Sequence, residues 1–215
     1  IGLTVMGFGI SALVVAPLLK AMIDNPAIGI LHTFLYAGIA FLVVILLLAQ
    51  LLLFPPADWQ PADTKTAIDP TIPPPPAPNL TRREMLKTRH FYALWMTYTI
   101  GCLAGLMAIG IASPVGTEVA KLDAAMATLA VSLFAIFNGL GRPLFGAITD
   151  KLGPRHTAML SFAMILGVSL LVSFFGHENA LLYFFAFCVL WMCLGGWLAI
   201  APTATGIFYE KKYYA

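Results

Sequence analysis

The sequence predicts an all-α integral membrane protein built as a polytopic helical bundle. Hydrophobic residues make up 60% of its 215 residues and charged residues 10%, whereas a soluble domain carries about 25% charged residues. The hydrophobic residues are gathered into six long stretches, each close to the roughly 20 residues that a membrane-spanning helix needs. Because so few charged side chains cannot form a polar coat, we expect lipid to surround most of the chain.

The six expected spans form two groups, with a proline-rich segment between the second and the third. The chain opens with Ile1 inside an apolar run, so we expect the chain to be a piece of a longer protein. The second span contains the dense run AFLVVILLLAQLLLF. In chain order the expected spans cover residues 2–19, 29–54, 91–113, 124–147, 158–176 and 181–209.

Residues 55–90, between the second and third spans, have a different composition. This segment includes four consecutive prolines at Pro73–Pro76. Proline lacks an amide donor and favours an extended conformation, which predicts a linker without a core of its own. A spacer is the favoured reading, and a docking site for a proline-binding partner is the alternative. Thr81 and Glu84 have the spacing of a capping box, which predicts a short interfacial helix before the third span.

The placement of basic residues predicts the orientation in the membrane. Nine of the twelve Lys and Arg residues lie on one side of a six-span chain, and by the positive-inside rule that side is cytoplasmic. The proline-rich loop and both chain ends are therefore expected in the cytoplasm. Lys20 and Lys121 lie on the opposite side, and Arg142 belongs to neither. The nine are Lys65, Arg82, Arg83, Lys87, Arg89, Lys151, Arg155, Lys211 and Lys212.

The sequence also argues against several classes of function. Twelve basic against ten acidic residues give no broad positive field, so a nucleic-acid partner is not expected. The three cysteines lie in apolar runs outside any Cys/His cluster, so neither a metal site nor a disulfide framework is expected. The sequence shows neither a nucleophile placed beside a base nor a glycine-rich phosphate-binding loop. We therefore expect neither an enzyme nor a bound cofactor.

Arg142 is the residue that most needs an explanation. It lies within the expected fourth span, and an arginine at that depth costs about 2.5–3.5 kcal/mol on insertion scales. Such a residue persists when it faces a water-filled cavity or a partner charge, and a guanidinium suits a carboxylate. Asn138 lies one helical turn earlier, so both side chains can grip one ligand. A structural ion pair or an arginine that reaches the headgroups is the alternative.

The expected loop after this span, residues 146–157, has the sequence GAITDKLGPRHT. Its charged side chains could form charge-assisted bonds to neighbouring helix ends, which would hold one conformation and break in another. A plain positive loop explains the cations but not the Gly/Asp/Gly spacing. The candidates for this conformational latch are Gly146, Asp150, Lys151, Gly153 and Arg155.

Two aromatic residues are further candidates for the binding site. Tyr98 in the third span could line a cavity, although aromatic residues near span ends often serve as interfacial anchors. Trp197 lies beside Gly195 and Gly196 in the sixth span and could contact a ligand or simply fill the gap that these glycines leave.

The segment GAITDKLGPR resembles the motif G-x-x-x-D-[RK]-x-G-x-[RK] of the major facilitator superfamily. FNGLGRPLFGAITDKLG and EMLKTRHFYALWMTYTIGCLAGLMAIG are similar to the eighth and seventh helices of its oxalate/formate antiporter family, which also has monocarboxylate-transporter-like bacterial relatives. The resemblance maps the chain to helices five to ten of twelve. It implies that 1–54 ends the N-terminal bundle, that 55–90 is the cytoplasmic central loop, and that 91–215 begins the C-terminal bundle.

The resemblance also implies a function and roles for particular residues. Such transporters are two bundles that rock about a midplane site, and Arg142 matches the family's carboxylate-binding arginine, with Asn138 as a supporting contact. A lysine on the eleventh helix would lie beyond Ala215. Leu194 and Leu198 stand where the oxalate antiporters have an aromatic pair, which favours a less charged, more apolar monocarboxylate.

We therefore expect part of a multi-pass secondary transporter of small organic anions in the plasma membrane. The substrate would be a monocarboxylate or short dicarboxylate such as lactate, formate or oxalate, moved by alternating access. Its partners would be that carboxylate, a coupled proton or counter-anion, the lipid bilayer and the missing helices of the same polypeptide. A membrane sensor or scaffold of the same fold that does not transport is the alternative.

Overall fold

The computed structural model describes residues 2–52 and 80–209. Every regular element in this part of the chain is a helix, which confirms the predicted all-α class. Five of these helices are long and apolar enough to cross a membrane. The proline-rich residues 53–79, including Pro73–Pro76, lie outside the described residues, so the predicted linker conformation stays a prediction.

The chain divides into two compact units. The described residues of one unit are 2–13 and 80–209, and those of the other are 14–52. Helix α1 (Gly2–Ile23) therefore contributes to both units, since its first half belongs to the first and its second half to the second.

The second unit holds the end of α1 and helix α2 (Gly29–Ala49). Lys20, in the last turn of α1, forms an exposed ion pair of 3.0 Å with Asp24. Gly29 begins α2 with a positive φ of 63°, a conformation that glycine adopts without steric cost. The apolar side chains of α2 are almost all exposed, as expected for a helix that lipid surrounds.

A short helix, α3 (Arg82–Met85), precedes α4 (Arg89–Pro114) in the first unit. The Thr81 amide and hydroxyl donate to Glu84 Oε2 at 2.8 and 2.7 Å, and the Glu84 amide donates to the Thr81 hydroxyl oxygen at 3.4 Å. This reciprocal pair confirms the predicted capping box. Thr88 caps α4 separately, because its hydroxyl accepts from the Phe91 amide at 3.3 Å.

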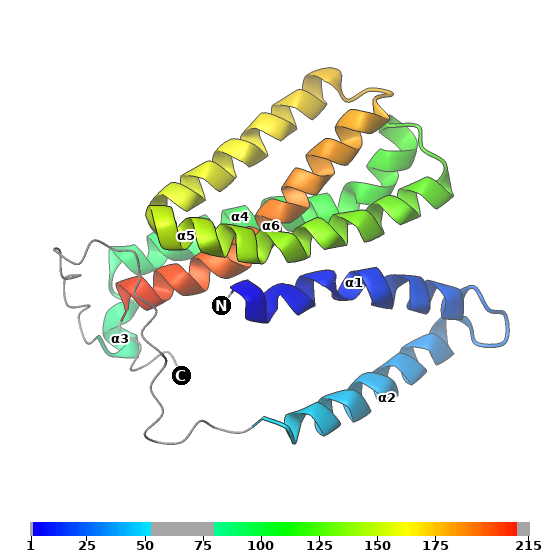
Figure 1. Ribbon diagram of the computed structural model, residues 1–215, viewed down its shortest axis with the longest axis horizontal. Helices are drawn as coiled ribbons and strands as arrows, with labels where there is room; N and C mark the ends of the chain where they lie inside the picture. Colours follow the sequence, from blue (N-terminus) through cyan, green and yellow to red (C-terminus); the bar gives the residue numbers. More distant parts are fainter. Residues whose placement is uncertain (1, 53–79, 210–215) are drawn as a thin grey trace. The chain divides into compact units, whose positions relative to one another are not determined.

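Helix α4 continues into a single π-helical turn, η1 (Val115–Val119), before the chain enters α5 (Ala124–Phe175). At 1.5 Å per residue the 52 residues of α5 would extend for about 78 Å, far more than a bilayer core of about 30 Å. Gly153 divides this helix, with non-helical φ and ψ of 77° and 160°. Figure 1 shows the two limbs, green and yellow, meeting at a sharp bend. The limbs, 124–152 and 154–175, correspond to the predicted fourth and fifth spans.

The prediction of a loop over residues 146–157 is therefore wrong, because Gly153 alone departs from helical geometry. Gly153 reverses the chain in one step, since its positive φ needs a residue without a Cβ. Pro154 then starts the second limb at a position where a missing amide costs no helical bond. The Thr157 hydroxyl donates to the Gly153 carbonyl oxygen at 2.9 Å and so provides a partner for that group at the bend.

Helix α6 (Ala180–Phe208) forms the centre of this unit. Thirteen of its residues are buried, and it packs along both α4 and α5. Near one end its Phe187 ring stacks on Phe134 of α5 with centroids 5.6 Å apart, and the Tyr183 hydroxyl donates to the Ala112 carbonyl of α4 at 2.7 Å. At the other end the Tyr209 hydroxyl lies 2.8 Å from the Thr88 hydroxyl.

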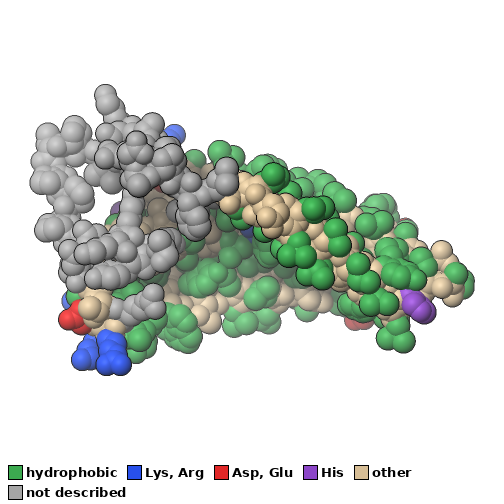
Figure 2. Space-filling model, turned by 90° about the horizontal axis from the view of Figure 1, so that it is seen from below, with side chains coloured by type: hydrophobic (Ala, Val, Ile, Leu, Met, Phe, Trp, Pro, Cys, Tyr) green, Lys and Arg blue, Asp and Glu red, His purple; other side chains and the backbone are tan. Residues whose placement is uncertain are grey.

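The outer surface of the described helices is largely apolar. Figure 2 shows hydrophobic side chains over much of the described surface in that view, and large residues such as Leu129, Leu166 and Phe174 are exposed. An apolar exterior of this extent suits the hydrocarbon of a bilayer.

Candidate functional site

The first limb of α5 carries Arg142, whose side chain is buried and 2% exposed. Its Nη1 donates to the carbonyl oxygen of Val5 in α1, and its Nη2 donates to Asn138 Oδ1 at 3.3 Å. The guanidinium carbon lies 4.7 Å from the centroid of the Phe8 ring, within the range of a cation–π interaction. The guanidinium is therefore held in one orientation by two neutral oxygens and an aromatic face.

No carboxylate compensates this charge within the part of the chain that the structure describes. The ion pair found there joins Lys20 to Asp24, and the buried Arg142 Nε has no hydrogen-bond partner. A buried cation without a counter-charge is costly. The arrangement is consequently able to accept an anion, which would satisfy Nε and neutralise the guanidinium together.

Asn138 lies one turn before Arg142, and its side chain is 6% exposed. The hydrogen bond between the two side chains confirms that they lie on one face of the helix, as their spacing predicts. The side-chain amide nitrogen of Asn138 can donate a hydrogen bond to a ligand that also accepts from the Arg142 guanidinium. The two residues can therefore bind one anionic ligand together.

Glycines set how closely the neighbouring helices approach this turn of α5. A Cβ added to Gly9 of α1 would lie 2.6 Å from the Cα of Gly139. On the α6 side, a Cβ on Gly195 would collide with the Asn138 carbonyl, and one on Gly141 with the Met192 carbonyl. These close contacts hold the Arg142 turn between α1 and α6.

Tyr98 of α4 is half-buried and lies close enough to Arg142 to interact with it electrostatically. Its side chain also packs against the cluster that contains the buried Phe145 and Cys193. The structure therefore brings three of the four predicted binding residues, Arg142, Asn138 and Tyr98, to one region.

Trp197, the fourth, belongs to the same buried cluster as Phe145 and Cys193, against which Tyr98 packs. It is fully buried, its ring lies 5.1 Å from that of Phe162, and it covers the surface of Gly101. It makes no ring contact or hydrogen bond with Arg142 among the described residues, and it lines a separate cavity. Its position favours the packing role that the adjacent glycines also allowed.

The predicted latch residues lie at the bend of α5. Asp150, Lys151 and Arg155 are exposed, and none of them forms an ion pair with another residue in 2–52 or 80–209. Gly153 makes the bend itself, while Gly146 is half-buried, and a Cβ there would lie 3.7 Å from the Cα of Gly2. The latch therefore stays a prediction.

Reasoning from sequence missed both contacts of Arg142 with α1. The partner at Val5 is a backbone carbonyl, which leaves no mark on the side-chain pattern. Phe8 had a weak signal, because it stands between Gly7 and Gly9 in a stretch where glycine permits close packing.

These features define a class, a polytopic α-helical membrane protein with a buried cationic site. Residues 1–211 match the sequence profile of the Major Facilitator Superfamily, and the chain belongs to this family. The family, together with relatives that are named as transporters, indicates a transporter and not an enzyme. The chain is accordingly a multi-pass membrane protein.

Two relatives give this placement more detail. The chain is similar to the oxalate:formate antiporter of Oxalobacter formigenes, with 25% identity over 214 residues, which is 100% of this chain and 48% of that protein. It is also similar to an uncharacterized MFS-type transporter, YhjX, of Escherichia coli strain K12, with 26% identity over 129 residues, or 60% of this chain and 32% of that protein. The chain thus spans about half the length of the first relative and a third of the second.

Proposed function

We propose that the chain is part of a secondary active transporter of small organic anions, in which Arg142 binds the substrate carboxylate. The observation that carries the proposal is the buried Arg142 guanidinium, which has no acidic partner among the described residues and an unsatisfied Nε. A planar carboxylate can accept from two guanidinium nitrogens at once. Asn138 and Tyr98 would add polar contacts beside it.

The substrate we propose is a monocarboxylate or short dicarboxylate such as lactate, formate or oxalate. Similarity to a protein named as an oxalate:formate antiporter supports this range. Leu194 and Leu198, rather than an aromatic pair, favour the less charged and more apolar members of it. Exchange against a counter-anion, or symport with a proton, would accompany transport.

The proposed mechanism is alternating access in the plasma membrane. In this arrangement residues 1–54 end an N-terminal bundle, 55–90 form the cytoplasmic central loop, and 91–215 begin a C-terminal bundle. Asp150, Lys151 and Arg155, with Gly146 and Gly153, would latch one state through partners on the rest of the polypeptide. The match of the chain to about half of a longer transporter supports this assignment.

Counterflow of a labelled carboxylate into proteoliposomes tests the site in the full-length protein. Arg142→Ala should reduce binding by roughly 30-fold or more, because truncating one partner of a buried charge pair costs about 2–5 kcal/mol. Arg142→Lys keeps the charge without the bidentate fork and should recover part of the loss. Arg83→Ala, which removes an exposed arginine of α3, is the matched control and should leave uptake unchanged.

Undiminished uptake by Arg142→Ala would overturn the assignment of the site. If the unaltered protein binds carboxylate but does not exchange it, the alternative of a membrane sensor with the same anion site would replace transport.

A further inference from the structure

A separate cavity of about 420 Å³ lies among α4, the second limb of α5 and α6. Its lining includes none of Arg142, Asn138 and Tyr98. Three ends of helical segments meet around it, namely the start of α4, the start of the second limb at Pro154, and the end of α6. Because a helix that crosses a membrane ends at the headgroup level, the cavity opens at the interface between hydrocarbon and water.

The cavity is an apolar groove that extends inward from this interface. On α6 its wall is a row at helical spacing, Trp197, Ile200, Ala204 and Phe208, which at 1.5 Å per residue runs for about 16 Å. Ala93 of α4 and Ala158 of α5 face the same space, and their small side chains leave it open. A long, narrow apolar volume with one end at the interface matches the shape of an acyl chain.

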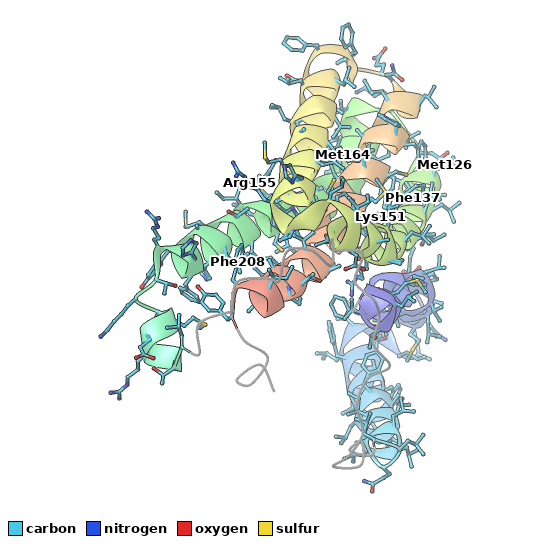
Figure 3. The ribbon with its side chains drawn as sticks, turned by 60° about the vertical axis from the view of Figure 1, so that its left-hand side comes forward. Met126, Phe137, Lys151, Arg155, Met164 and Phe208 are labelled. Carbon is cyan, nitrogen blue, oxygen red and sulfur yellow. The ribbon has the colours of Figure 1, made fainter. Side chains whose placement is uncertain are left out.

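The side chains at the mouth of the groove carry a positive charge or can donate hydrogen bonds. His90, in the first turn of α4, and Arg155, in the first turn of the second limb, both line the cavity. Figure 3 shows Arg155 at the bend of α5 and Phe208 near the end of α6, and the Phe208 and His90 rings lie 6.3 Å apart. Among the described residues that line the cavity none is acidic, and Arg155 forms no ion pair with a described residue.

We propose that this groove binds an anionic phospholipid, with an acyl chain along the α6 row and the phosphate at Arg155 and His90. The guanidinium binds phosphate oxygens through its fork, and the imidazole offers an N–H in either tautomer. Basic pockets between spans are recognised sites for lipid headgroups. A free phosphate or a soluble anion would leave the apolar length of the groove unused.

Trp197 allows the occupant to be detected directly, because its indole is part of the wall. In full-length protein in which Trp197 is the sole tryptophan, bromine atoms on an acyl chain quench its fluorescence by contact. The protein is reconstituted into phosphatidylcholine vesicles that contain a minor fraction of either brominated phosphatidylglycerol or brominated phosphatidylcholine. We expect the apparent affinity for the anionic lipid to be about fivefold higher or more, given one or two cationic contacts.

Two variants and two matched controls distinguish the contribution of the headgroup contacts from that of the apolar groove. Arg155→Gln combined with His90→Gln should abolish the preference for phosphatidylglycerol, whereas Arg83→Gln, on an exposed arginine outside the lining, should keep it. Ala93→Leu, which fills the groove from an exposed position of α4, should reduce quenching by both lipids. Ala163→Leu, at an exposed alanine of α5 that does not line the cavity, should not.

Equal quenching by the two brominated lipids, or no quenching by either because another segment of the polypeptide fills the groove, would overturn the proposal. Native mass spectrometry of protein that keeps all its tryptophans provides a second measurement. Bound phosphatidylglycerol that does not decrease in the Arg155→Gln, His90→Gln protein would overturn it equally. Both readouts report lipid and not transport, so they are independent of the Arg142 assignment.

Discussion

At the scale of single residues, Arg142 shows how a membrane protein can bury a cationic side chain among neutral groups. Its neighbours are a carbonyl, an amide oxygen and an aromatic ring. These groups orient the guanidinium without neutralising it, so its full charge remains available to a ligand. A carboxylate neighbour would have closed the site by forming a permanent ion pair.

Glu84 provides a prediction about pH at this scale. Hydrogen bonds from the Thr81 hydroxyl and amide hold the pKa of the exposed Glu84 carboxyl below its usual value. Because the pKa is lower in the folded state, the cap stabilises α3 fully above the ordinary pKa and is lost as pH falls through the lowered one. An NMR titration of the Glu84 side chain should therefore give a midpoint below the ordinary value of a glutamate.

Thr81→Ala is the control for that titration. It removes the hydroxyl donor, which is the largest cause of the shift, and should move the midpoint back up toward the ordinary value. A midpoint that stays the same in Thr81→Ala would show that the capping box does not stabilise the ionised carboxylate.

At the scale of elements, the packing of α5 on α6 depends on two glycines. Gly141 and Gly195 each face a backbone carbonyl of the other helix, which cannot rotate away as a side chain can. Gly141→Ala and Gly195→Ala should each lower the free energy of unfolding by about 1–3 kcal/mol, the usual cost of overpacking. The thermal unfolding midpoint of the purified protein measures the effect.

Gly167, also in α5, is the matched control for these substitutions. No atom lies within 4 Å of an added Cβ there, so Gly167→Ala should be neutral or stabilise by about 0.5–1 kcal/mol through the backbone entropy of glycine. A similar loss of stability at Gly167 and Gly141 would mean that the close contact at the crossing does not decide the result.

The bend at Gly153 gives a second prediction for α5. Its φ and ψ of 77° and 160° fall in a region that is essentially restricted to glycine, where other residues cost about 1–3 kcal/mol. Gly153→Ala should destabilise by that amount, although nothing lies within 4 Å of an added Cβ. Gly153→Asn should not recover the loss, because asparagine tolerates the left-handed helical region but not this one.

Gly206→Ala serves as the reference for the bend in thermal unfolding. Gly206 is helical and has equally open surroundings, so its substitution should not destabilise. Wild-type stability in Gly153→Ala would show that the chain can reverse at this point with a different backbone conformation.

At the scale of the whole molecule, the charge distribution makes a prediction about topology. Cysteines at Arg83 and Lys151 should react with an impermeant maleimide only after the membrane is opened, and cysteines at Asp123 and His177 should react from outside. The protein used would lack its native Cys102, Cys188 and Cys193. If the cysteine at Lys151 reacts from outside together with that at Asp123, α5 does not cross the membrane twice.

Much of the fold was predictable, because hydrophobic length is a strong signal in a membrane protein. The expected spans begin or end within a few residues of α1, α2, α4 and α6, and the capping box located α3. The extent of the loop at 146–157 was not predictable from polarity, since charged residues such as Asp150 and Lys151 remain helical when they extend into water. One glycine with a positive φ completed the reversal instead.

The candidate site was predictable only in part, for a similar physical reason. Arg142 and Asn138 can be recognised in the sequence as polar residues at helical spacing in an apolar span. Val5 contributes through a carbonyl that every residue has, and Trp197 has the same adjacent glycines whether it faces a ligand or a groove. Which helix lies against which face depends on tertiary packing, which a single sequence does not display.

The single-residue joint in α5 has a consequence for anyone who engineers this protein. Epitope tags, fluorescent proteins and new chain termini are normally placed in loops, where extra length is absorbed by slack. Between residues 152 and 154 there is no loop to take up extra residues. An insertion would therefore have to unwind a turn of one limb. The direction of each limb relative to the other therefore depends on this single residue. A cut or an inserted segment at the bend would remove that constraint.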